Sequence, residues 1–104
     1  MRLGIDLGTT RTVVAVSDRG NFPVVGFSTP EGDVVDHVPT ISAATDHGLV
    51  HGHAAEHAAL RGAPHLRSWK RLLGRYGPEH RVCIGDVDLS LMELCEDFLR
   101  ALAG

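Results

Sequence analysis

The sequence predicts a mixed α/β fold for this chain of 104 residues. Residues 3–6 are predicted to form a short strand before a glycine turn, and residues 12–17, which are apolar and β-branched, are typical of a second strand. Near the other end, Ser90 and Glu93 have the spacing of a helix-capping box and precede a long apolar stripe of helical period. Strand patterns followed by a strong helical pattern therefore indicate strands packed against helices.

Turn residues divide the N-terminal third of the chain. The segment 18–21 contains Gly20, which favours a hairpin leading into a third strand at residues 23–27. Residues 28–40 have the proline, glycine and acidic residues that are typical of a loop. The opening of the chain is therefore expected to be an antiparallel meander that ends near this loop.

Shorter elements are predicted in the rest of the chain. They are a hairpin of residues 40–44 and 49–51, a helix at 54–60, a helix from about Pro64 to Gly74, a strand at 81–84 and a helix from Ser90. The buried face of the helix that begins near Pro64 is expected to include Trp69. The buried face of the last helix is formed by Leu91, Leu94, Cys95, Phe98, Leu99 and Leu102.

Composition argues against several classes of protein. A net charge of -3 and a pI near 6.1 give no basic surface for nucleic acid. No apolar run approaches the roughly 18 residues of a membrane helix, and the N-terminus lacks the pattern of a secretory signal, so we expect a cytoplasmic protein without a membrane partner. Cys83 and Cys95 match no metal or redox spacing and are predicted to be free thiols.

The turn that follows the first strand carries groups suited to a phosphate. Gly8 allows the backbone to approach a ligand closely, and the amides and hydroxyls of Thr9 and Thr10 can donate to phosphate oxygens. A carboxylate beside a phosphate repels it unless a cation lies between them, so Asp6 fits a Mg²⁺ ion. The alternative is a structural role, in which Asp6 accepts backbone hydrogen bonds in an Asx-type turn.

Several stretches also resemble one protein family. GIDLGTT, followed by a β-branched strand, is similar to the first phosphate loop of the actin-like ATPase and sugar-kinase superfamily, and most similar to the DnaK type, the seventy-kilodalton heat-shock chaperones. Further along, TPEGD with DHVPT, LVHGHAAEHAAL, SWKRLLGR and the terminal LSLMELCEDFLRALAG resemble successive segments of that family. Similarity that keeps its order along the whole chain is more specific than any single motif.

The resemblance implies a ribonuclease-H-like lobe of the actin-like ATPase type. It divides the chain into a core β meander with the phosphate loop at about 1–36, a small inserted α+β subdomain at about 37–89, and a helix at about 90–104 that leads back to the core. The chain would then be the N-terminal part of a nucleotide-binding domain, which takes ATP or ADP with Mg²⁺. The second phosphate loop, the adenosine site and the region that meets client peptides and co-chaperones would lie beyond it.

The resemblance also assigns roles to individual residues. Asp6 would organise Mg²⁺ and its waters, and the turn of Gly8, Thr9 and Thr10 would hold the β- and γ-phosphates. Lys70 would reach the γ-phosphate and position the attacking water, in a reaction whose catalysis is mostly positioning and electrostatics. Without the resemblance, Lys70 would be a solvated helix lysine.

The sequence departs from the family at two places. Arg11 replaces a residue that is often asparagine or aromatic, and it contacts either phosphate or a neighbouring acid. The segment between Arg75 and Ser90 is shorter than usual for the family, so a strand pair is expected to be missing there.

Other interpretations remain open at this point. Because the nucleotide lies between two lobes in this superfamily, we expect weak or undetectable binding of ATP by this chain alone. A sugar-kinase-like protein and a non-enzymatic module that self-associates through an uncovered face are the alternatives. His51, His53 and His57 are predicted to be scattered surface histidines, since zinc requires about four ligands.

Overall fold

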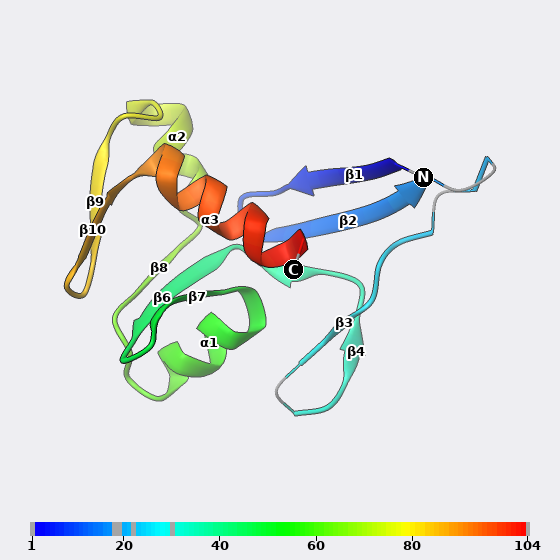
Figure 1. Cartoon of the computed structure of the whole chain (residues 1–104), viewed down its shortest axis with the longest axis horizontal. Coiled ribbons are helices and arrows are strands. Elements are labelled where there is room, and N and C mark those ends of the chain that lie inside the picture. Colours follow the sequence, from blue (N-terminus) through cyan, green and yellow to red (C-terminus); the bar gives the residue numbers. More distant parts are fainter. Residues whose placement is uncertain (1, 18–19, 22, 30, 104) are drawn as a thin grey trace.

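The computed structural model describes residues 2–17, 20–21, 23–29 and 31–103 and has a mixed α/β architecture (Figure 1). The elements are β1 (Arg2–Leu7), β2 (Arg11–Ser17), β3 (Phe27–Ser28), β4 (Val34–Val35), β5 (Val38–Pro39), β6 (Ile41–Thr45), β7 (Gly48–His51), α1 (Gly52–Leu60), β8 (His65–Arg67), α2 (Lys70–Tyr76), β9 (Arg81–Ile84), β10 (Val87–Ser90) and α3 (Leu91–Ala103). One antiparallel sheet has the strand order β1-β2-β5, a second has the order β7-β6-β8, and two further hairpins are β3-β4 and β9-β10. No helix in these ranges is both long enough and apolar enough to cross a membrane.

The first two strands form the predicted hairpin, with Asp6 opposite Val13. The prediction of a third strand at 23–27 is wrong, because that segment makes only an isolated bridge between Val24 and Ala15. Proline at position 23 accepts a hydrogen bond through its carbonyl oxygen but has no amide hydrogen to donate, which limits further pairing. The third strand of the sheet is instead β5, which comes from the predicted loop 28–40.

Residues 28–40 contain more regular structure than a loop. Phe27 pairs with Val35 in the small β3-β4 hairpin, and β5 then runs beside β2, so that Thr12 lies opposite Val38. These strands have two residues each, and strands that short leave no readable alternation in a sequence.

The predicted β6-β7 hairpin and the α1 helix are confirmed. Thr45 pairs with Gly48, whose φ of 108° is a conformation that favours glycine. Gly52, at the start of α1, has a φ of 65°, and a Cβ there would overlap the Val38 side chain. The helix can therefore pack closely against β5 only with glycine at this position.

The helix expected from Pro64 to Gly74 begins later and ends later. Residues 65–67 form β8, which pairs with the free edge of β6, and only then does α2 begin at Lys70. The helix continues through Gly74 to Tyr76, and it is followed by the C-cap residue Gly77, whose φ is 86°. The edge of β6 offers hydrogen bonds that are distant in sequence, and these override the local helical pattern.

The core lies between α2, α3 and the strands beside them. Trp69, Leu91, Leu94 and Phe98 are fully buried, and the Trp69 and Phe98 rings meet edge to face with 5.3 Å between centroids. The apolar stripe predicted for the last helix is therefore confirmed, as is the burial of Trp69. Figure 1 shows α3 running from the β9-β10 hairpin back toward the N-terminal sheet.

The predicted strand at 81–84 is confirmed as β9, and its partner β10 was not foreseen. Both strands lie in the short segment between Arg75 and Ser90. That segment therefore contains a strand pair.

The capping box predicted at the start of α3 is confirmed, and its loss should lower the stability of the fold. The Glu93 amide donates to the Ser90 hydroxyl at 3.1 Å, and the Ser90 amide donates to the Glu93 carboxylate at 3.0 Å. Because the cap closes the helix that buries Phe98, we expect Ser90→Ala to lower the free energy of unfolding by about 1 kcal/mol at pH 7. Urea unfolding measures this loss, and unchanged stability would contradict it.

The same box predicts how stability depends on pH. The Ser90 amide, with weaker help from the Ser90 hydroxyl and from Arg81, lowers the pKa of Glu93 below its ordinary value. A carboxyl group with a lowered pKa stabilises the fold above its unfolded-state pKa, and this contribution is lost as pH falls through the folded-state value. In a pH series of urea unfolding, Glu93→Gln should therefore lose less stability on acidification than the unchanged chain.

Candidate functional site

The candidate site begins at the turn between β1 and β2. Asp6 lies near the end of β1, and its carbonyl oxygen accepts a hydrogen bond from the Gly8 amide at 3.1 Å. A Cβ on Gly8 would overlap the Arg11 carbonyl oxygen, so this turn can be formed only with glycine. The requirement for Gly8 is thus a matter of space within the turn itself.

The polar groups of the turn are available to a ligand. The Asp6 side chain is exposed and, among the described residues, has no hydrogen bond or ion pair. The Asx-type alternative for Asp6 is therefore not what the structure shows. Within the same ranges, the amides of Thr9 and Thr10 have no hydrogen-bond acceptor. Free donors on the turn and a free carboxylate near the end of the strand before it are groups that bind a phosphate together with a cation.

Lys70 is the first residue of α2 and is exposed, whereas its neighbour Trp69 is fully buried. The residue before Trp69 is unusual. Ser68 has a φ of 52°, the one positive φ of a non-glycine residue in the described ranges. Such a conformation costs about 1–3 kcal/mol and is enriched at functional sites. The chain is therefore strained two residues before the amine predicted to reach the γ-phosphate.

Thr40 connects the turn to the start of α2. Its hydroxyl donates to the Gly8 carbonyl oxygen at 2.9 Å, and its amide donates to the Thr10 carbonyl oxygen at 3.0 Å. Its own carbonyl oxygen accepts a hydrogen bond from the Ser68 amide at 2.9 Å. The structure thus brings the predicted turn and the segment that carries Lys70 together through one intermediate residue.

Arg11 is exposed at the start of β2. The hydrogen bond from His37 at 3.2 Å is the main cause that lowers the pKa of the nearby Asp36, and the charge of Arg11 makes the smallest contribution. Phosphate and a neighbouring acid both remain predicted partners of Arg11.

The sequence analysis did not predict the polar cluster that His51 forms with Ser42 and Asp97. His51 is not a surface histidine: its side chain is 3% exposed, and its two ring nitrogens lie 2.7 Å from the Ser42 hydroxyl and 2.7 Å from the Asp97 carboxylate. Its ring edge also packs on Phe98. The residue types match a hydrolytic triad, but Ser42 is fully buried and cannot meet a substrate. The cluster instead ties β6 and β7 to α3.

The other two histidines of that group differ from His51. His57 is 43% exposed and lies 3.9 Å from Glu31, as expected for a surface residue. His53 is half-buried, and one of its ring nitrogens lies 2.8 Å from the His37 carbonyl oxygen.

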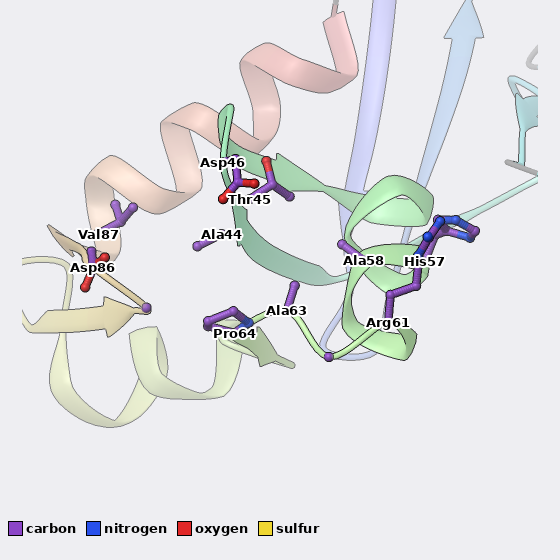
Figure 2. A pocket seen from close by; sticks show the side chains of 12 residues that line it. Ala44, Thr45, Asp46, His57, Ala58, Arg61, Ala63, Pro64, Asp86 and Val87 are labelled. Atoms are coloured by element: carbon purple, nitrogen blue, oxygen red, sulfur yellow. The ribbon is translucent and has the colours of Figure 1, made fainter.

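Two concavities lie away from the predicted phosphate site. The larger, of about 730 Å³, is formed where the β6-β7 turn, the end of α1 and the β9-β10 turn meet. Figure 2 shows Asp46, Asp86, His57 and Arg61 contributed to it from these three places. The second, of about 440 Å³, is lined partly by acidic residues of α3. Neither is lined by Asp6, by the turn at 8–10 or by Lys70.

No protein-family model matches the chain.

Proposed function

We propose that this chain is the N-terminal part of the nucleotide-binding domain of a chaperone-like ATP hydrolase with the actin-like ATPase fold. The turn at 8–10, Asp6 and Lys70 form one wall of its Mg·ATP site. The observation that carries the proposal is a set of three hydrogen bonds at Thr40, which donates to the carbonyl oxygens of Gly8 and Thr10 and accepts from the Ser68 amide. These bonds join two segments that are far apart in sequence and that each expose a group suited to a nucleotide phosphate.

The residues present fit Mg²⁺ and phosphate. Mg²⁺ prefers oxygen ligands and usually keeps several bound waters. The exposed Asp6 carboxylate can accept hydrogen bonds from such waters. The amides of Thr9 and Thr10 are donors without acceptors in the described ranges, as a phosphate requires. When bound, Mg²⁺ neutralises charge on the phosphate oxygens.

The reaction class is hydrolysis of a phosphoanhydride. Water adds to the γ-phosphorus, the bond to the β-phosphate oxygen breaks, and ADP and inorganic phosphate leave. The exposed Lys70 ammonium stabilises the negative charge on the transferred group, while the turn holds the phosphates in line. A cleft closed by a second lobe would exclude bulk water, which is why one wall alone should bind weakly.

A nucleotide titration of Lys70→Ala tests the assignment. Because Lys70 is proposed to contact the γ-phosphate, we expect the variant to bind Mg·ATP about tenfold more weakly, the loss that corresponds to one charge-assisted contact. Its affinity for Mg·ADP should change much less. Amide chemical shifts, which detect millimolar binding, provide the measurement, and the turn at 8–10 should show the largest changes.

Arg71→Ala is the matched control, since Arg71 is an exposed cation on the same helix. Equal losses of ATP affinity in the two variants would reduce the role of Lys70 to general attraction and contradict the assignment. Micromolar affinity of the unchanged chain would contradict the expectation that the chain supplies only one wall.

A further inference from the structure

Thr40 occupies the junction between the two three-stranded sheets. Pro39 before it pairs with Arg11 of the N-terminal sheet, and Ile41 after it pairs with Arg67 of the second sheet. The Thr40 side chain is buried, with a relative exposure of 2%. A polar side chain that is buried at such a junction requires hydrogen-bond partners.

Every polar group of Thr40 has a partner. The amide and the hydroxyl donate to carbonyl oxygens of the turn, and the carbonyl oxygen accepts from Ser68. The Thr40 hydroxyl also lies 3.0 Å from the hydroxyl of the fully buried Thr12. Because the single hydroxyl hydrogen of Thr40 goes to Gly8, Thr12 must be the donor in this last pair.

The hydrogen bond from the Thr40 hydroxyl to the Gly8 carbonyl oxygen determines the direction of the Thr9 N–H. In a trans peptide, the carbonyl oxygen of one residue and the N–H of the next point in opposite directions. The described ranges contain no cis peptide bond. Since the Gly8 carbonyl oxygen points at the buried Thr40 hydroxyl, the Thr9 N–H points away from the buried side, where a phosphate can reach it.

The hydrogen bond from the Ser68 amide to the Thr40 carbonyl oxygen lies just before Lys70, the other half of the proposed site. Ser68 has a strained backbone, and its carbonyl oxygen accepts a hydrogen bond from the Arg71 amide at 3.2 Å in the first turn of α2. Strained residues persist only where the surroundings hold them. The bond from the Ser68 amide to Thr40 provides such support just before Lys70.

We propose that Thr40 is a positioning residue, which fixes the direction of the Thr9 amide relative to Lys70 so that both can meet the phosphates of one nucleoside triphosphate. The inference rests on the proposed function for its ligand. Its geometric part concerns the free chain and can be tested without nucleotide.

The test compares Thr40→Val with Thr40→Ser. Valine has nearly the shape of threonine but leaves the Gly8 carbonyl oxygen without its donor, whereas serine keeps the hydroxyl. Residual dipolar couplings report the direction of the Thr9 N–H bond in the free chain. We expect this direction to change in Thr40→Val and to be retained in Thr40→Ser.

Thr12→Val is the matched control, because it removes a buried hydroxyl of the same network and leaves the bond from Thr40 to Gly8 in place. It should retain the direction of the Thr9 N–H bond. An unchanged direction in Thr40→Val, or an equal change in Thr12→Val, would overturn the positioning role.

A measurement on the unchanged chain covers the case in which Thr40→Val does not fold. The amides of Thr40 and Ser68 should exchange with solvent slowly and with similar protection, because both form hydrogen bonds at the same buried junction. Fast exchange at either amide would overturn the proposal.

Nucleotide binding separates this inference from the function on which it rests. If the proposed function holds, Thr40→Val should weaken Mg·ATP binding by about tenfold while Thr40→Ser retains it. If the couplings change as expected but no variant shows Mg·ATP-dependent shifts at the turn, Thr40 positions the turn and the nucleotide proposal fails.

Discussion

Replacing Trp69 with alanine is expected to lower the free energy of unfolding by about 3–5 kcal/mol, in a domain whose total is about 5–15 kcal/mol. The Trp69 side chain is fully buried in the main apolar cluster and packs edge to face on Phe98. Its removal leaves a cavity between α2 and α3 that the surrounding residues can fill only in part. Urea unfolding followed by circular dichroism measures the loss.

Trp69→Phe is the informative comparison. Within the described ranges, the buried Trp69 indole N–H has no hydrogen-bond acceptor, so phenylalanine removes an unsatisfied donor while keeping an aromatic ring. We expect a smaller loss, about 1–2 kcal/mol. If alanine cost no more than phenylalanine, Trp69 would not be the centre of this core.

Gly8→Ala is expected to have the second large effect. A Cβ on Gly8 would overlap the Arg11 carbonyl oxygen, and a backbone atom cannot move aside as the end of a side chain can. Opening the turn would also break the bond between the Gly8 carbonyl oxygen and the Thr40 hydroxyl. Together these changes should cost about 2–4 kcal/mol of stability and abolish any Mg·ATP-dependent shift at residues 8–10.

Gly74→Ala provides the matched control. Gly74 lies inside α2, where an added Cβ would meet no atom within 4 Å. Alanine there should raise the free energy of unfolding by about 0.5–1 kcal/mol, because glycine is a poor helix former. The two substitutions are chemically identical, so an effect of the same sign and size in both would contradict the steric argument at Gly8.

Elements with strong local signals were predictable from the sequence. The capping box of Ser90 and Glu93 and the apolar stripe after it located α3, and the pair of short strand patterns at 40–44 and 49–51 located the β6-β7 hairpin. These features depend on residues close to one another in the chain, so short sequence patterns predict them.

Elements formed by distant pairing were missed. Residues 65–67 form a strand only because β6 offers a free edge to them, and β5 replaces the expected third strand beside β2. The two residues of β5 carry no sequence pattern that identifies β2 as their partner strand. Tertiary context decides the state of such short segments.

The candidate site shows the same division. Short motifs and the resemblance to a protein family predicted Asp6, the turn at 8–10 and Lys70 as site residues. The connection between them depends on Thr40, which is 32 residues from Gly8, and the buried His51 ring is hydrogen-bonded to Asp97, 46 residues away. Contacts at such separations have no periodic signal in a single sequence.

Relaxation of amide signals by Mn²⁺·ATP tests the central claim most directly, because Mn²⁺ accepts the same oxygen ligands as Mg²⁺ and broadens the signals of nearby nuclei. We predict that the amides of residues 8–10 and of Lys70 broaden together in one titration, and that Asp6→Asn suppresses both effects. Broadening at only one of the two segments, broadening centred on Asp46 and Asp86, or no broadening at either segment would contradict the claim that they form one phosphate site.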